Sequence, residues 1–147
     1  MTEIPSSVAQ VQERFRSLNL HDALLLGIII QGAGADDDEE IRLSIEMVVG
    51  RNADQWKPAE LRLVGCVQTS ISLDLWAKRQ CSHMIGDGHC TYDREWVRQR
   101  EIEEPIRQRA QRLENILKFT IDMCPPGGTL NIFARDFHLN WLDASRE

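Results

Sequence analysis

Four residues within one ten-residue segment have side chains that bind transition metals. Cys81, His83, His89 and Cys90 are arranged as Cys-x-His-x5-His-Cys. Thiolate and imidazole are the ligands that zinc takes in tetrahedral sites. Paired zinc ligands are usually separated by two to four residues, however, and adjacent residues do not turn easily toward one ion. The segment is therefore a candidate zinc site, and the alternative is a loop with buried thiols and no metal.

Two other clusters contain residue types that occur in catalytic or metal-binding sites, but their residues are not spaced as such sites require. His21 and Asp22 could act as a general base and its orienting carboxylate, but adjacent residues on an extended chain point to opposite faces. We expect them to cap a turn at the entrance of a strand. The acidic run 36–40 offers oxygen ligands for calcium but lacks the alternating ligand positions of an EF-hand loop. We expect this run to be a solvated hairpin tip.

No pattern in the sequence indicates an enzyme. Cys66 falls on an expected strand and Cys124 precedes two prolines, and neither has a histidine at a spacing known from cysteine nucleophiles. The sequence contains no Gly-x-Ser-x-Gly, no phosphate-binding glycine loop and no His-Glu-x-x-His. We therefore expect no catalytic and no cofactor-binding residue.

Composition narrows the class of protein. A chain of 147 residues, 42% of them hydrophobic, suits a single domain over residues 1–147. Its net charge of -6 argues against binding to nucleic acid or to an anionic membrane. The longest apolar run, 23–30, is far shorter than the ~20 residues of a membrane span. Residues 1–7 show no signal-peptide pattern, so the four cysteines are expected as reduced thiols in the cytoplasm.

The first half of the chain alternates between apolar and polar residues in ways that predict a helix and then strands. Helical spacing within 1–19 predicts an N-terminal helix that ends at Asn19 in the left-handed conformation. The segment 23–31 is apolar on both faces and predicts a buried central strand. A hairpin connector over 32–40 leads to a half-buried strand over 41–49. The stretch 61–75 predicts one long strand or two collinear ones, with a bend at Gly65.

In the second half, the pattern is interrupted by an irregular and helical excursion over 76–114. The glycines of Gly86-Asp87-Gly88 predict a turn inside it, and Asp93 is the expected N-cap of its helix. Alternation over 117–123 and again from 130 predicts a final hairpin, with a change of parity toward 139. The fold class is therefore α+β, with a mostly antiparallel, curled sheet of five or six strands, an N-terminal helix and a helix inserted before the last hairpin.

Three segments together resemble certain small uncharacterised bacterial β-rich proteins, some of which are immunity proteins of toxin and immunity pairs. These segments are Leu20-His21-Asp22-Ala23 at the start of a strand, the middle strand 61–67 and the final hairpin 116–139. The resemblance implies a stoichiometric protein that neutralises a toxin, and it transfers no catalytic residue. In such a pair, an acidic surface complements a basic partner.

Two classes of function follow. The first is a non-enzymatic protein-binding module, either an immunity-type inhibitor or another interaction protein. Four tryptophans near the ends of expected elements, Trp56, Trp76, Trp96 and Trp141, are candidate interface anchors. An exposed edge strand would also allow a homodimer. The alternative is a small-ligand or zinc-binding protein with its site in the 81–90 loop.

Overall fold

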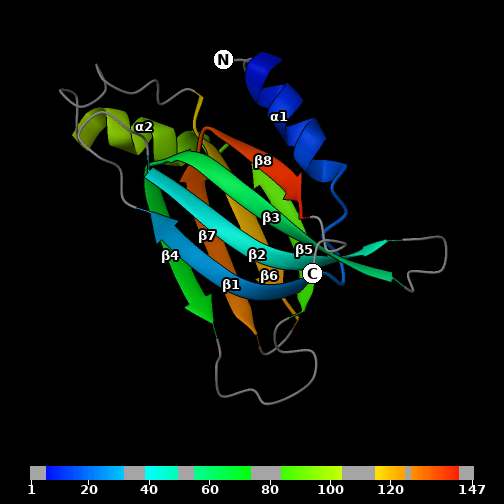
Figure 1. Ribbon diagram of the computed structural model, residues 1–147. Coiled ribbons are helices and arrows are strands. Elements are labelled where there is room, and N and C mark those ends of the chain that lie inside the picture. Colours follow the sequence, from blue (N-terminus) through cyan, green and yellow to red (C-terminus); the bar gives the residue numbers. More distant parts are fainter. Residues whose placement is uncertain are drawn as a thin grey trace.

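The computed structural model describes residues 6–31, 39–49, 55–73, 84–103, 115–124 and 127–142. These residues form two helices and eight strands: α1 (Ser6–Arg16), β1 (Leu24–Gln31), β2 (Glu39–Val49), β3 (Gln55–Cys66), β4 (Gln68–Leu73), β5 (Ile85–Thr91), α2 (Arg94–Glu103), β6 (Leu117–Met123), β7 (Gly128–Ala134) and β8 (Asp136–Trp141). The strands build two antiparallel sheets that lie face to face (Figure 1). The first sheet has the order β1-β2-β3-β8, and the second has the order β4-β7-β6-β5. The predicted α+β class is confirmed, but a single sheet of five or six strands is wrong.

The chain passes between the two sheets at two adjacent points. β3 leads into β4 through Val67, two residues after Gly65, which has a φ of 66°. β7 leads into β8 through Arg135. The two crossings are hydrogen-bonded to each other, because the Val67 amide donates to the Phe133 carbonyl (2.9 Å) and the Arg135 amide donates to the Val64 carbonyl (3.0 Å). The prediction of a bend at Gly65 is confirmed. The two strands on either side of it are not collinear, since they belong to different sheets.

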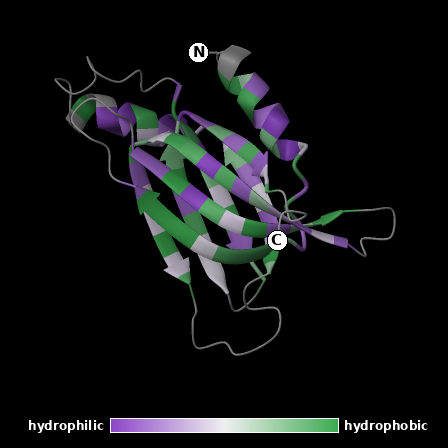
Figure 2. Ribbon diagram, viewed as in Figure 1, coloured by the Kyte–Doolittle hydropathy of each residue, from purple (hydrophilic) through white to green (hydrophobic). Residues whose placement is uncertain are grey.

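The core lies between the sheets and is built by strands with strict alternation. β2 and β6 bury every second side chain, as the period of a strand requires when one face meets the core. Hydrophobic and hydrophilic residues also follow one another along the ribbon of β2 (Figure 2). Helix α1 contributes Phe15, which is 2% exposed and packs edge-on against Phe119 and Phe137 with ring centroids 5.1 Å apart in both pairs. Aromatic pairs of this kind add about 0.5–1.5 kcal/mol each to the energy of burial. The helix is thus part of the core and packs against β5 and β8.

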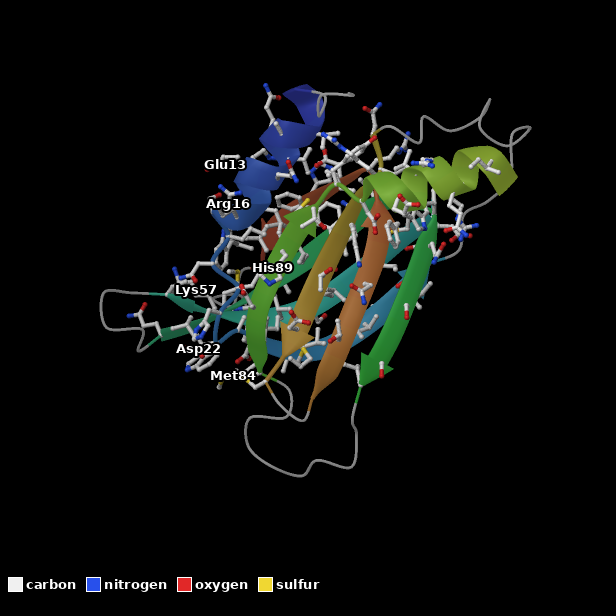
Figure 3. All side chains as sticks on the ribbon, turned by 180° about the vertical axis from the view of Figure 1, so that it is seen from behind. Glu13, Arg16, Asp22, Lys57, Met84 and His89 are labelled. Atoms are coloured by element: carbon white, nitrogen blue, oxygen red, sulfur yellow. The ribbon has the colours of Figure 1, made fainter. Side chains whose placement is uncertain are left out.

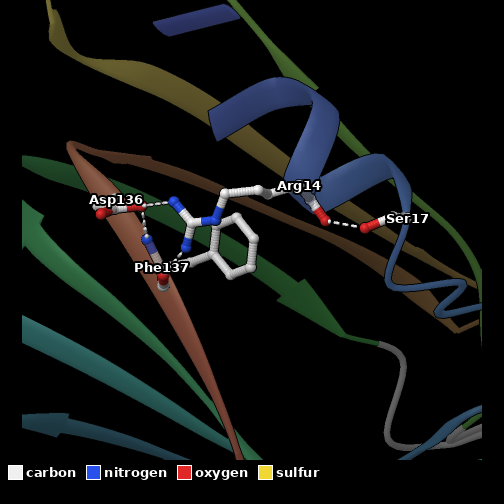
Figure 4. A network of polar contacts seen from close by, with 4 residues as sticks. All are labelled: Arg14, Ser17, Asp136 and Phe137. Carbon is white, nitrogen blue, oxygen red and sulfur yellow. Dashed lines mark hydrogen bonds and ion pairs between the residues drawn. The ribbon is translucent and has the colours of Figure 1, made fainter. Parts of the chain in front are cut away.

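Hydrogen bonds and an ion pair connect α1 to β8 (Figure 4). The Arg14 guanidinium donates to the Asp136 carboxylate (3.2 Å) and to the Phe137 carbonyl (3.1 Å), and it lies 4.8 Å from the centre of the Phe137 ring. The Ser17 hydroxyl donates to the Arg14 carbonyl at the end of the helix (2.7 Å). Asn19 follows with a φ of 53°, so the predicted left-handed residue after the helix is confirmed.

The predicted irregular excursion contains a strand. Of the segment 76–92, residues 76–83 lie outside the described part of the chain. The strand β5 spans Ile85–Thr91 and pairs with β6 along its length. The turn predicted at Gly86-Asp87-Gly88 is wrong, because these residues belong to β5 and are accompanied by a register shift rather than a reversal of the chain. Glycine and aspartate are rare in strands, so local preference favoured a turn while tertiary pairing formed a strand.

Helix α2 lies across one end of the second sheet (Figure 1). Its predicted N-cap is confirmed, since the Trp96 amide donates to the Asp93 carboxylate (3.0 Å). The Trp96 indole stacks on Phe133 with centroids 4.2 Å apart, and Val97, Ile116 and Phe133 form a small second core. Among the described residues, no helix is long and apolar enough to cross a membrane.

Candidate functional site

The structure describes two of the four predicted zinc ligands. Cys81 and His83 lie outside the described residues, while His89 and Cys90 are neighbours in β5. Cys90 packs against the core, where burial raises the pKa of its thiol to about 12, and His89 is exposed on the other face. Neighbours on a strand point to opposite faces, so these two side chains do not converge. The four-ligand zinc site stays a prediction that depends on Cys81 and His83.

His89 instead meets two carboxylates on the outer face of the second sheet (Figure 3). Its Nε2 atom lies 3.1 Å from Asp87 Oδ2 and 3.9 Å from Asp122 Oδ2. The Thr129 hydroxyl donates to the other oxygen of Asp122 (3.0 Å). All three titratable side chains are about half exposed, so water competes for each of them. Within the described part of the chain, no cluster of His, Cys, Asp or Glu has the geometry to hold a metal.

The other two polar clusters named from the sequence, His21-Asp22 and the acidic run 36–40, lie in or beside elements of the first sheet. His21 Nδ1 lies 3.1 Å from Asp22 Oδ2, and both side chains are exposed in the turn between α1 and β1. The Asp22 amide donates to the Ile85 carbonyl (2.9 Å), which joins this turn to β5. A turn at the strand entrance is confirmed, but the expectation that His21 and Asp22 point to opposite faces is wrong, because their side chains meet each other. Of the acidic run 36–40, the first three residues lie outside the described part, and Glu39 and Glu40 belong to β2.

Burial raises the pKa of two of the described cysteine thiols, Cys66 and Cys90. Cys66 is buried, its Sγ lies 3.1 Å from the Leu63 carbonyl oxygen, and burial raises the pKa of the thiol to about 11. Cys66, Cys90 and Cys124 are all free. Since the thiolate is the reactive form, thiols with raised pKa values are poorly suited to covalent catalysis.

The strand predicted to be buried and central is an exposed edge. β1 lies at the end of the first sheet, and Leu26, Ile29 and Ile30 are 60%, 53% and 58% exposed. One side of β1 pairs with β2 over its whole length. On its other side, the described residues supply a single bridge, from Leu24 to Met84. Apolarity on both faces indicated burial, but the described helices leave the outer face of β1 uncovered (Figure 1).

Apart from one bulge, the strand β1 lacks the sequence features with which soluble proteins protect an exposed edge. The segment 24–31 has the sequence LLLGIIIQ and carries no charge and no proline, as the hydrophobic colouring of its ribbon shows (Figure 2). Charged side chains, proline and very short strands are the usual devices that prevent an edge from pairing with another chain. A bulge between Leu25 and Gly27 is the one such device present in this strand. We name the exposed side of Leu24–Gln31 the β1 edge.

Carboxylates of the neighbouring strand flank the β1 edge. Glu46 is the partner of Leu24 in the register, and Glu40 is the partner of Gln31. The Arg62 guanidinium donates to Glu40 and lowers the pKa of its carboxyl, so Glu40 stays charged in the neutral range. Arg42, the register partner of Ile29, also lies close to Glu40 (3.7 Å), so side chains of both charges lie beside the apolar residues of β1.

Two of the four tryptophans are exposed on the first sheet. Trp56 on β3 is 42% exposed, and Trp141 on β8 is 52% exposed. Trp96 is held against Phe133 and donates to the Gln68 side chain (3.2 Å), so it anchors α2 instead of an interface. Trp76 lies outside the described residues.

A scan of protein-family models, a search of curated proteins and a search of solved structures each found no match to this chain. Functional conclusions must therefore come from the geometry of the chain itself.

Proposed function

We propose that this chain is a non-enzymatic protein-binding module that takes an extended segment of a basic partner protein as an additional strand along the β1 edge. The observation that carries the proposal is the exposure of Leu26, Ile29 and Ile30 on an uncharged edge strand. In this mode of recognition, main-chain hydrogen bonds supply affinity and alternate side chains supply specificity.

The exposed aliphatic side chains set the scale of the affinity. Complete burial of a leucine or isoleucine contributes about 1.5–3 kcal/mol, so burying the exposed half of each of three contributes about 1 kcal/mol apiece. The ladder hydrogen bonds add roughly 0.5–1.5 kcal/mol each, and ordering the partner segment offsets part of the sum. A dissociation constant in the micromolar range, about -8 kcal/mol, is consistent with these terms.

Charge favours a basic partner over a second copy of the chain. Two copies would each bring a net charge of -6. A basic partner would be attracted to the same surface, which raises its association rate and favours it over acidic competitors. An immunity-type inhibitor, which the sequence resemblance implies, is a narrower form of this proposal in which the basic partner is a toxin.

The test uses a labelled peptide of alternating valine and threonine with lysines at both ends. Fluorescence anisotropy would measure its binding to the wild type, to Ile29→Lys on the β1 edge and to the matched control Ser70→Lys. Ser70 is exposed on β4, the edge strand of the other sheet, so the control adds the same charge elsewhere. We expect micromolar binding that weakens with salt, is lost in Ile29→Lys and is retained in Ser70→Lys.

Three results would overturn the proposal. The first is no binding at millimolar peptide, and the second is equal loss of binding in both variants. The third is a wild-type dimer, measured by light scattering, that Ile29→Lys converts to a monomer. That result would assign the β1 edge to self-association.

A further inference from the structure

The glycine in the middle of β1 is the one described glycine that the fold itself does not require. The described glycines are Gly27, Gly65, Gly86, Gly88 and Gly128. A Cβ atom at any of the last four would come within 3.4 Å of another residue, and two of these four have a positive φ. At Gly27 the φ lies outside the positive range, and the nearest atom to a Cβ would be Ser44 Cβ, 3.9 Å away. Glycine weakens a strand and often marks a point where a ligand or another chain approaches closely.

The missing side chain leaves a gap in the outer face of the β1 edge. Gly27 pairs with Ser44 of β2, and a Cβ atom at Gly27 would point along the same face as the Ser44 side chain. On either side of the gap, Leu26 and Ile29 are 60% and 53% exposed. The gap therefore interrupts a row of large aliphatic residues, and it opens a path from the edge of the sheet to β2.

The bulge in β1 determines where an added strand can pair regularly. The register with β2 shifts just before Gly27 and is continuous over the five residues from Gly27 to Gln31. An added strand can therefore form a regular ladder with these five residues, with Gly27 at one end. Because side chains alternate along a strand, those opposite Ile28 and Ile30 face the core side, and the one opposite Gly27 lies over the gap.

The far end of the gap is polar. Ser44 lies there between Arg42 and Glu46 of the same strand, and Glu60 of β3 is the register partner of Ser44. Arg42 Nε lies 3.7 Å from Glu40 Oε1, so its charge is balanced in part. Glu46 is half-buried, and in the part of the chain that the structure describes it has no hydrogen bond or ion pair. The two carboxylates favour a cation over an anion at this end of the gap.

We infer, on the basis of the proposed function, that Gly27 determines the specificity of the β1 edge by admitting a lysine or arginine of the added strand. The stem of this side chain crosses Gly27, and its charge meets Glu46. Two strand spacings are about 10 Å, and two residues along a strand are about 7 Å. The four-carbon stem of lysine and the side chain of glutamate together bridge this separation when no side chain stands at position 27.

The test compares three labelled peptides that differ at one position. Each has nine residues of alternating threonine and valine between terminal glutamines, and its central threonine is replaced by lysine, norleucine or alanine. Norleucine has the stem of lysine without its charge. Fluorescence anisotropy of the wild type should give a dissociation constant about tenfold lower for the lysine peptide than for the alanine peptide, with the norleucine peptide between them.

Two variants of the chain separate the size of the gap from its charge. Gly27→Val should weaken the lysine peptide by about tenfold and the alanine peptide by less than about twofold, while Tm does not fall, because valine favours a strand. The matched control Ser70→Val, at the edge strand β4, should change neither peptide. Glu46→Gln should remove the preference for lysine over norleucine, whereas Glu13→Gln, at an exposed position on α1, should keep it.

The outcomes distinguish this inference from the proposed function. If none of the peptides binds, or if Ile29→Lys weakens none of them, the β1 edge takes no strand and both are overturned. If Ile29→Lys abolishes binding but the wild type binds all three peptides equally, the edge takes a strand and only the role of Gly27 is overturned. The same conclusion follows if Gly27→Val weakens the lysine and alanine peptides to the same extent.

Discussion

Replacing Gly128 with alanine should be severely destabilising, because the space for a side chain is taken by the backbone of another strand. Gly128 begins β7, has a φ of 103° and pairs with Leu73 of β4. A Cβ atom there would lie 2.8 Å from the Ser72 carbonyl carbon and 3.0 Å from the Leu73 Cα. Backbone atoms cannot rotate away as a side chain can, so the end of β4 must move.

The magnitude follows from two separate costs. A non-glycine residue in this region of φ costs about 1–3 kcal/mol. Displacing the end of β4 loses one or two ladder hydrogen bonds, at about 0.5–1.5 kcal/mol each. A total loss of about 3 kcal/mol is a large part of the 5–15 kcal/mol that is typical for a domain, and it would lower Tm by about 10 °C.

Urea unfolding measures this loss, and Gly27→Ala is the matched control. The nearest atom to a Cβ at Gly27 is Ser44 Cβ, at 3.9 Å, which is an ordinary contact. The control should therefore change the free energy of unfolding by less than about 0.5 kcal/mol, or stabilise slightly by restricting the unfolded chain. The reasoning is refuted if Gly128→Ala loses less than about 1 kcal/mol, or no more than Gly27→Ala loses.

Three further changes test the core, the charge network and the buried thiols. Phe15→Ala should lower the free energy of unfolding in urea by about 3–5 kcal/mol, because the ring is buried in the core. The control Glu13→Ala, at an exposed position of the same helix, should lower it by less than about 0.5 kcal/mol. Equal losses in the two variants would place Phe15 outside the core. Arg62 lowers the pKa of Glu40, so this carboxylate stabilises the fold above its ordinary pKa of 4.5, and the effect is lost as pH falls through the lower folded value. The stability difference between wild type and Glu40→Gln should therefore be full near about pH 7 and should vanish in acid, and a difference constant with pH would contradict the ion pair. Burial raises the pKa of Cys90 to about 12, so iodoacetamide at about pH 8 should modify this thiol at least about a hundredfold more slowly in the folded than in the unfolded chain. Peptide mass spectrometry would follow the two rates, and equal rates would show that the thiol is accessible.

Local sequence pattern was sufficient where one face of an element meets the core. β2 and β6 alternate strictly because their outer faces meet water, and both were predicted within two residues of their observed bounds. One end of each helix could also be predicted, to within a few residues, because Asn19 favours the left-handed conformation after a helix and Asp93 favours the N-cap position.

The sequence pattern predicted the wrong structure where contacts with distant segments determine the local conformation. β5 has the sequence IGDGHCT, which predicts a turn, yet it is paired along its length with β6. Gly88 supports this strand because a Cβ atom there would come within 2.9 Å of Leu20 Cδ1, a residue far away in the sequence. The crossing at Gly65 was visible as a bend, but the sequence could not show that the strand beyond it joins another sheet.

The sequence did not predict the β1 edge, because a strand of apolar residues such as LLLGIIIQ can be either buried in a sheet or exposed at its edge. An uncharged strand that is apolar on both faces suggests burial, and only the sheet order shows that β1 is an edge. The other three edge strands are different in composition or cover: β4 carries polar residues at Gln68, Thr69, Ser70 and Ser72, while β5 and β8 carry aspartate and histidine and pack against α1. β4 is also an exposed edge without charge, but its exposed side chains are polar, whereas those of β1 are the large aliphatic residues Leu26, Ile29 and Ile30. Because an apolar edge that the described residues leave open invites aggregation, it supports the proposal that a partner protein covers β1.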